Sequence, residues 1–149
     1  MNDDELMEGV RRAFEVLDPV PDDVLAAARA AIAWRTPFAT LAEPAQDRET
    51  RPAAGVRGET ARVLTFTCPG ATVEIEVAER GRDREITGRL VPASSGVVQV
   101  RHPGLPREGI TARADGDGMF WVPRVPAGLV SLVLRLDDGT SVVTSWVRL

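Results

Sequence analysis

The stretch Asp115-Gly116-Asp117-Gly118-Met119-Phe120-Trp121-Val122-Pro123-Arg124-Val125-Pro126-Ala127-Gly128-Leu129-Val130-Ser131-Leu132-Val133-Leu134-Arg135-Leu136 decides the fold of this chain. It begins with two Asp-Gly pairs, which predict a tight turn because glycine tolerates positive φ and aspartate hydrogen-bonds its own backbone. Phe120 and Val122 then share one face of a short strand, and Met119 and Trp121 share the other. The stretch predicts β-structure and contains no catalytic motif.

A proline-rich corner separates this strand from a longer one. Pro123 and Pro126 lack the backbone N–H that a sheet ladder uses, so we expect them to end the first strand. After Gly128 an alternating pattern predicts a strand with one face in the core. The apolar members of that pattern are Val130, Leu132, Leu134 and Leu136.

The same alternation recurs in short segments from about residue 61 onward. Leu64, Phe66 and Cys68 alternate with Val63 and threonines, for example. Many short strands separated by turns are typical of a β-sandwich or a small barrel. The predicted strands cover residues 62–68, 72–79, 85–91, 97–102, 110–114, 119–122, 129–136 and 141–148.

The turn and its neighbouring strands resemble a known family. Residues 115–134 are similar to the signature of carboxypeptidase regulatory-like domains, which are small transthyretin-like β-sandwiches. The matching residues are Asp115, Asp117, Gly118, Phe120, Val125, Pro126, Gly128, Leu132 and Leu134. With the likeness of 86–90 and 97–100 to that family's first strands, the resemblance covers about 86–147. It implies a mainly β, Greek-key sandwich that serves as an accessory module, because most such domains carry no catalytic residues.

Two helices are predicted ahead of the strands. Residues 3–17 carry apolar side chains at helical spacing after three acidic residues, which suit the positive end of a helix. Residues from about 22 to 35 are rich in alanine and begin with two aspartates. We therefore predict an acidic arm at 1–42 that forms a helical hairpin, a linker at 43–60 and a β-sandwich domain at 61–149.

Charge and composition narrow the classes of partner. Residues 1–60 hold 12 acidic and 7 basic residues, whereas residues 61–149 hold 10 and 11, and all 18 basic residues are arginine. The acidic arm argues against nucleic acid and against an anionic membrane surface. The chain has no signal-peptide pattern and no apolar run of ~18 residues, so we expect a cytoplasmic protein. The arginine usage indicates a GC-rich, actinobacterial genome.

Each candidate for catalysis or metal binding has a simpler structural interpretation. Asp115 and Asp117 resemble the opening of a calcium loop, but Pro126 stands where that loop needs its glutamate. His102 is the single histidine, so no second imidazole joins it as a metal ligand. Cys68 is the single cysteine and lies on the apolar side of its strand, as a structural thiol would. We predict no cofactor, no metal site and no enzyme activity.

The remaining candidates are apolar side chains suited to contact with another protein. They form one stripe along each helix and include tryptophans expected to point outward from their strands. The predicted protein-binding residues are Leu6, Val10, Phe14, Leu17, Leu25, Ile32, Trp34, Trp121 and Trp146. Three alternatives stay open: the arm covers the tryptophans, a second copy binds to form a homodimer, or Trp121 and Trp146 stack on a carbohydrate or small ligand.

The arm carries a second resemblance. Asp18-Pro19-Val20-Pro21, the alanine run at 26–30 and Ala33-Trp34-Arg35 are similar to segments of small uncharacterised actinobacterial proteins. Those proteins are associated with genes for alternative sigma factors and for caspase-like or other peptidases. The resemblance implies a regulatory adaptor whose partner is a sigma factor or peptidase encoded nearby. The zinc-binding His-x3-Cys-x2-Cys motif of many anti-sigma factors is not in the sequence.

Overall fold

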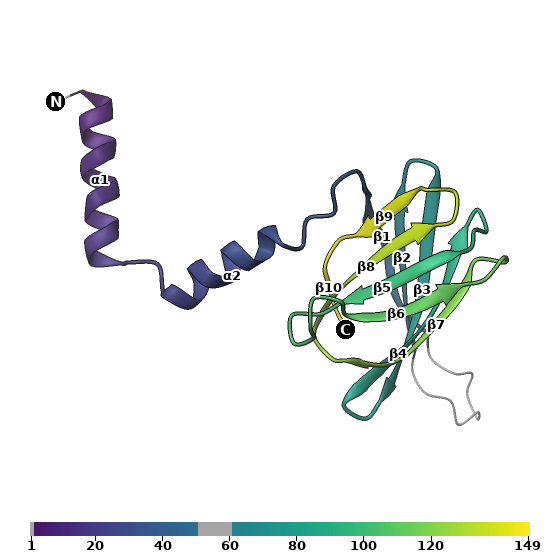
Figure 1. Ribbon diagram of the computed structural model, residues 1–149. Helices are drawn as coiled ribbons and strands as arrows, with labels where there is room; N and C mark the ends of the chain where they lie inside the picture. Colours follow the sequence, from purple (N-terminus) through teal and green to yellow (C-terminus); the bar gives the residue numbers. More distant parts are fainter. Residues whose placement is uncertain (1, 51–60) are drawn as a thin grey trace. The chain divides into compact units, whose positions relative to one another are not determined.

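The computed structural model describes residues 2–50 and 61–149, and the chain divides into two units, Met1–Pro37 and Phe38–Leu149 (Figure 1). The first unit contains two helices and the second contains all the strands. The boundary lies after Pro37, so the predicted boundaries at residues 42 and 61 are wrong. The physical reason is an unpredicted strand that begins at Thr40.

Helix α1 (Asp3–Leu17) matches its predicted range, and α2 (Asp22–Ile32) ends three residues before its predicted end. A capping box begins α1: the Glu5 N–H donates to Asn2 Oδ1 (2.8 Å), and the Asn2 N–H donates to the Glu5 carboxylate (3.2 Å). All residues of both helices are solvent-exposed. Within the described residues, no helix combines the length and the apolarity that crossing a membrane requires.

The second unit is mainly β, as predicted, and its strands form one mixed sheet. The sheet order is β6-β5-β8-β9-β1-β2-β3-β4-β7, and β10 pairs with β8. The two end strands, β6 and β7, are joined by the turn after Ala114, so the sheet nearly closes into a barrel (Figure 1). The strands are β1 (Thr40–Thr50), β2 (Ala61–Cys68), β3 (Ala71–Arg80), β4 (Asp83–Val91), β5 (Gly96–Arg101), β6 (Ile110–Ala114), β7 (Met119–Pro126), β8 (Leu129–Leu136), β9 (Ser141–Thr144) and β10 (Val147–Arg148).

Strand β1 replaces most of the predicted linker. Its first residues, Thr40 to Ala42, pair in parallel with β9, and Glu43 to Thr50 pair antiparallel with β2. The same strand therefore belongs to both halves of the sheet, and the prediction of a linker is wrong for 43–50. The other part of that predicted linker, 51–60, lies outside the described residues.

The composition of β1 explains why its alternation was missed. Its fully buried residue is Ala42, a small side chain that gives a weak apolar signal. Pro44 lies at a shift of the β1–β2 register between Pro44 and Gln46, where an irregularity tolerates a residue without an N–H. Strand β1 pairs with its neighbours through backbone N–H and C=O groups, so this pairing leaves no pattern of side chains in the sequence.

Strand β7 also continues where we expected it to stop. It extends to Pro126, which pairs with Asp83 on β4. The register shifts between Arg84 and Ile86, and opposite this shift Arg124 adopts a left-handed backbone conformation (φ 57°). The irregularity lets the strand pass Pro123 and still place Val125 in the core, where it is fully buried.

The core occupies the inside of this sheet. Inward side chains from every strand between β2 and β9 except β6 contribute large apolar residues, and β6 contributes Ala114. The largest fully buried members are Phe66, Leu64, Ile75, Ile86, Leu90, Leu132 and Leu134. The predicted inward residues of 62–68 and 129–136 are thus confirmed, apart from the half-buried Leu136 and Cys68.

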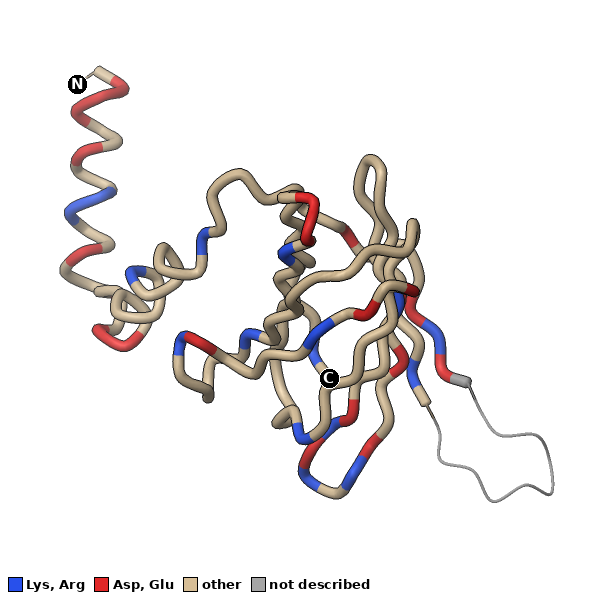
Figure 2. Tube along the Cα trace, turned by 45° about the vertical axis from the view of Figure 1, so that its right-hand side comes forward, with Lys and Arg blue, Asp and Glu red and all other residues tan. Residues whose placement is uncertain are grey.

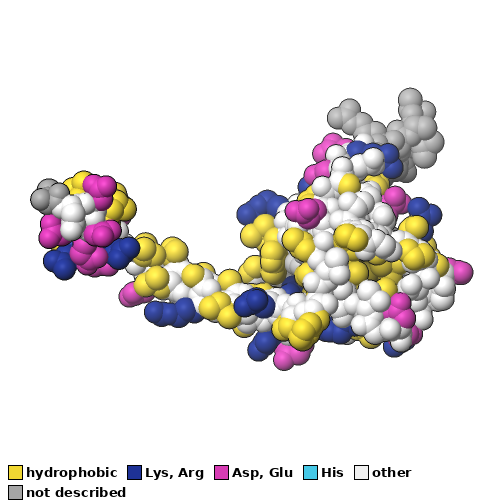
Figure 3. Space-filling model, turned by 90° about the horizontal axis from the view of Figure 1, so that it is seen from above, with side chains coloured by type: hydrophobic (Ala, Val, Ile, Leu, Met, Phe, Trp, Pro, Cys, Tyr) yellow, Lys and Arg dark blue, Asp and Glu magenta, His cyan; other side chains and the backbone are white. Residues whose placement is uncertain are grey.

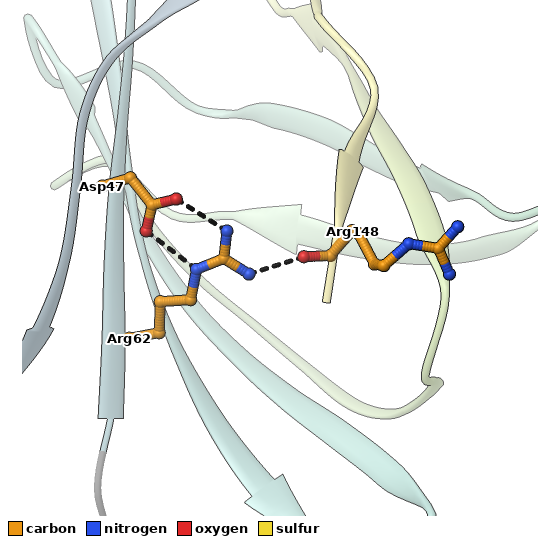
Figure 4. A network of polar contacts seen from close by, with 3 residues as sticks. All are labelled: Asp47, Arg62 and Arg148. Atoms are coloured by element: carbon orange, nitrogen blue, oxygen red, sulfur yellow. Dashed lines mark hydrogen bonds and ion pairs between the residues drawn. The ribbon is translucent and has the colours of Figure 1, made fainter.

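Arg62 connects the two halves of the sheet through a polar network (Figure 4). Its Nε and Nη2 donate to the two carboxylate oxygens of Asp47 on β1, at 2.8 and 2.7 Å. Its Nη1 donates to the backbone carbonyl of Arg148 on β10. Because β10 pairs with β8, one guanidinium links β1, β2 and the C-terminal strands. These hydrogen bonds lower the pKa of Asp47 below its ordinary value.

We predict that Asp47→Asn weakens the β unit at neutral pH and much less in acid. The folded-state pKa of Asp47 lies below the unfolded value, so its stabilisation is present above the unfolded pKa and is lost as the pH falls through the folded one. The Asp47 side chain is 50% exposed, which limits the effect to at most about 1 kcal/mol. Urea unfolding across that pH range measures it, and an equal loss at every pH would contradict this account.

A second prediction concerns the fragment that can fold alone. Residues 38–149 should unfold cooperatively in urea, because they contain the whole sheet and its core. Residues 61–149 should lack that transition, because removing β1 exposes the facing edges of β2 and β9. Circular dichroism during a urea titration compares the two fragments. A matching cooperative transition in 61–149 would show that β1 is dispensable.

Candidate functional site

The apolar stripes of the two helices are exposed to solvent. Along α1, Leu6 is 50% exposed, Phe14 64% and Leu17 82%, with Val10 on the same side. On α2, Leu25 and Ile32 are exposed as well. Figure 3 shows hydrophobic side chains on the helix surfaces. These are the residues that the sequence analysis assigned to protein binding.

The tryptophans differ from one another in their surroundings. Trp34 follows α2 and is half-buried, and its backbone N–H donates to the carbonyl of Ala31. Trp121 lies on β7 and is 57% exposed, whereas Trp146 follows β9 and is 40% exposed. In the sheet order, β8, β5 and β6 separate β9 from β7 on one side, and β1 to β4 separate them on the other. Trp121 and Trp146 therefore belong to segments that are not neighbours in the sheet.

Val142 is the inward residue at the start of the last predicted strand: it is buried in the core, whereas Val143 is only half-buried. The segment 141–148 is two strands, β9 and β10, separated by Ser145 and Trp146. The Ser145 N–H donates to the carbonyl of Ala42, which continues the contact of β9 with β1. The two extra residues interrupt the alternation of inward and outward side chains.

Trp121 borders a shallow groove on the outer surface of the sheet. The groove has a volume of about 270 Å³ and lies over β2, β3, β4 and β7. It is lined by Val63, Glu74, Glu76, Thr87, Gly88, Arg89 and Met119. Trp121 is the cross-strand partner of the lining residue Thr87, so it lies next to the lining residues without being one of them. The groove around Glu74 and Glu76 was not predicted, because no local sequence pattern shows which strands flank β3.

His102 acts as a connection between loops. Its Nδ1 accepts the Gly104 N–H (2.8 Å), and its Nε2 lies 3.0 Å from the carbonyl oxygen of Ala127. The tautomer with hydrogen on Nε2 satisfies both contacts, since it accepts at one nitrogen and donates at the other. Gly128 adopts positive φ beside the ring, where an added Cβ would lie 2.8 Å from Nε2. Both ring nitrogens thus hold the β7–β8 corner against the segment after β5.

The other two candidates also have structural contacts. The Cys68 thiol is half-buried and donates to the carbonyl of Ala71 at 3.6 Å. The Asp115 carboxylate accepts the backbone N–H groups of Asp117 and Met119 at 3.0 and 2.9 Å, as an aspartate does in a turn. Across residues 2–50 and 61–149, no three His, Cys, Asp or Glu side chains gather where they could hold a metal ion.

A cluster of arginines on β5 and β8 was missed by the sequence analysis. Arg101 is only 7% exposed, and burial, followed by the nearby charges of Arg135 and Arg107, lowers its pKa. Gln99 organises the group: it accepts from Arg135 Nη1 (3.1 Å) and donates to the backbone carbonyls of Arg107 and Glu108. Arg101 lies on β5, Arg135 on β8 and Arg107 between β5 and β6, and the pairing of β5 with β6 and β8 that brings them together has no local sequence signal.

We predict that a chelator leaves the melting temperature unchanged, while His102→Ala lowers it. Loss of the imidazole leaves the Gly104 N–H and the Ala127 carbonyl without this partner, a cost of about 1–2 kcal/mol. Differential scanning calorimetry with and without EDTA measures both effects. A fall in melting temperature on chelation that His102→Ala abolishes would instead make His102 a metal ligand.

The chain matches no protein-family model, and no curated protein or solved structure matches it either. The likeness to carboxypeptidase regulatory-like domains and the likeness to actinobacterial regulatory proteins therefore stay predictions.

Proposed function

We propose that this protein is a non-enzymatic adaptor that binds another protein through its two N-terminal helices. The observation that supports the proposal is the exposure of both apolar stripes. Leu6, Phe14 and Leu17 on α1, and Ile32 on α2, are each at least half exposed. Large apolar side chains at helical spacing are the anchors with which a helix binds in a groove of a partner.

The energetics favour a partner. Helices of 15 and 11 residues are marginal in water by themselves, because nucleation is costly. Fully burying one Leu or Phe side chain contributes about 1.5–3 kcal/mol. Burial of three or four such anchors would stabilise both the helices and the complex, although ordering the flexible chain offsets part of the gain.

The charge of the helices indicates the kind of groove that would suit them. Acidic residues begin both helices, as Figure 2 shows: Asp3, Asp4 and Glu5 on α1, then Asp22 and Asp23 on α2. A partner with an apolar groove and a basic border would complement this pattern and would associate faster at low ionic strength. An acidic surface of this kind makes nucleic acid an unsuitable partner.

The finer features of the proposal come from the two resemblances. We place residues 86–147 among Greek-key, transthyretin-like sandwiches of the carboxypeptidase regulatory-like family, supported by the turn at Asp115 and the strands that flank it. We also propose a cytoplasmic location and a partner, such as a sigma factor or a peptidase, encoded near this chain. The similarity of the segments 18–21 and 26–35 to actinobacterial regulatory proteins supports that choice of partner.

We predict that Phe14→Ala combined with Leu25→Ala abolishes partner capture and leaves the melting temperature of the β unit unchanged. Both side chains are exposed, so their removal takes no contact from the core of the second unit. Affinity capture from a lysate of the native host, followed by mass spectrometry, compares the variant with the natural chain. Scanning calorimetry of the same two proteins reports stability.

Val16→Ala is the matched control. Val16 is 79% exposed on the same helix but lies off the stripe that contains Phe14. Its removal should leave the captured partner unchanged. Unchanged capture by the double variant would contradict the adaptor function. Sedimentation of the purified chain distinguishes a second copy from a different protein as the bound partner.

A further inference from the structure

The outer surface of β2, β3, β4 and β7 has a regular arrangement set by strand register. One row across these strands contains Val63, Glu76, Thr87 and Trp121 in that order. The neighbouring row contains Thr65, Glu74, Arg89 and Met119. Since successive rows on one face are two residues apart along each strand, the eight side chains form one continuous surface.

Gly88 sets the register that puts Trp121 in this surface. On the inner side of the sheet, a Cβ at Gly88 would lie 2.0 Å from Cζ of Phe120, so the Phe120 ring occupies the space that any side chain would need. Phe120 is 3% exposed and packs in the core directly opposite Gly88. This inward contact fixes β7 against β4 and therefore aligns Trp121 with Thr87 on the outside.

The surface contains a groove with an apolar floor and polar walls. Val63 faces outward and yet is only 8% exposed, which makes it the floor of the groove. The walls contain the Glu74, Glu76 and Arg89 side chains, and Arg89 Nη2 lies 3.5 Å from Glu74 Oε1. At the β7 edge, Trp121 and Met119 are 57% and 40% exposed. The volume of about 270 Å³ is close to the lower end of the range for small-molecule sites.

The mixture of donors and acceptors restricts the chemistry of a ligand. Glutamate accepts hydrogen bonds, arginine donates them, and the Thr87 hydroxyl does both. An anion would lie beside the two glutamates, and a cation beside Arg89, so each would meet a like charge. A neutral ligand rich in hydroxyl groups can donate to Glu76 and accept from Arg89 at the same time. Its C–H face can lie on the exposed indole of Trp121, as amphipathic aromatic rings allow.

We propose that the outer face of β2, β3, β4 and β7 is a binding site for a neutral saccharide, which stacks on Trp121 and hydrogen-bonds to Glu76, Thr87 and Arg89. The distance from the Glu76 strand to the Trp121 strand is two strand spacings, about 10 Å. This span suits a sugar ring on Trp121 followed by a second ring over Thr87. The site is independent of the helices, which belong to the other unit.

The test measures binding of oligosaccharides to the full chain by isothermal titration calorimetry. The probes are the neutral hexamers cellohexaose, laminarihexaose, maltohexaose and hexa-N-acetylchitohexaose at millimolar concentrations, with an oligogalacturonate as the anionic probe and a chitosan oligomer as the cationic probe. We expect at least one neutral hexamer to bind more tightly than either charged probe. Trp121→Ala should weaken that binding at least about tenfold, as truncation of an aromatic anchor does. Glu76→Gln should weaken it about threefold or more, because a neutral amide oxygen then accepts the hydrogen bond in place of a charged carboxylate.

Trp146→Ala is the matched control, because Trp146 is also exposed but follows β9 on another part of the sheet. This variant should bind the saccharide as the natural chain does. Trp121 is 57% exposed, so Trp121→Ala should keep the natural melting temperature, and calorimetric unfolding confirms that the variant is folded. Arg89→Met retains most of the side-chain volume and provides a second variant of the site.

The proposal is overturned if no neutral hexamer binds, if a charged probe binds more tightly than all of them, or if Trp121→Ala binds as well as the natural chain. Phe14→Ala with Leu25→Ala should leave saccharide binding intact, since both residues lie on the helices. Loss of partner capture in that variant, together with retained saccharide binding, would separate the two functions. If the partner-capture experiment contradicts the adaptor function, the saccharide titration still tests the saccharide site, and the reverse also holds.

Discussion

The fold depends on one strand that is shared between two halves of a sheet. Strand β1 pairs in parallel with β9 through its first three residues and antiparallel with β2 through the rest. Its contribution is mainly backbone hydrogen bonding, since Ala42 is its fully buried side chain. Without it, the strands on either side would each present an unpaired edge. Arg62 strengthens the connection between the two halves of the sheet, because its guanidinium connects Asp47 on β1 with the backbone of Arg148 on β10.

This arrangement distributes the functional surfaces over different parts of the β unit. The order of the sheet places Trp121 and Trp146 on strands that are not neighbours, so each has separate surroundings. Beside Trp121 lies a groove with carboxylates and an arginine, whereas the β5–β8 pair carries the arginine cluster around Gln99. The single histidine and the single cysteine make backbone contacts instead.

The helices present a different physical situation. Their side chains lie in solvent, while the core of the chain is supplied by the strands alone. Burial of these apolar stripes against another surface would remove them from water and would stabilise that contact. The acidic residues at both helix starts stabilise the helices through the helix dipole. The proposed protein-binding arm and the proposed saccharide site use residues of different units.

The sequence by itself determined the features that depend on local physics. The α1 range follows from its 3.6-residue period and the acidic residues at its start, the turn at Asp115 from Asp-Gly chemistry, and most strands from alternation of apolar residues. Only the tertiary structure decided β1, the passage of β7 beyond Pro123, and the inward position of Val142. Each of these depends on backbone pairing with a strand distant in sequence, and backbone groups are the same in every residue except proline. The exposed helix stripes could be predicted from spacing, but the groove could not, because the neighbours of Glu76 and Trp121 are set by the register of four strands.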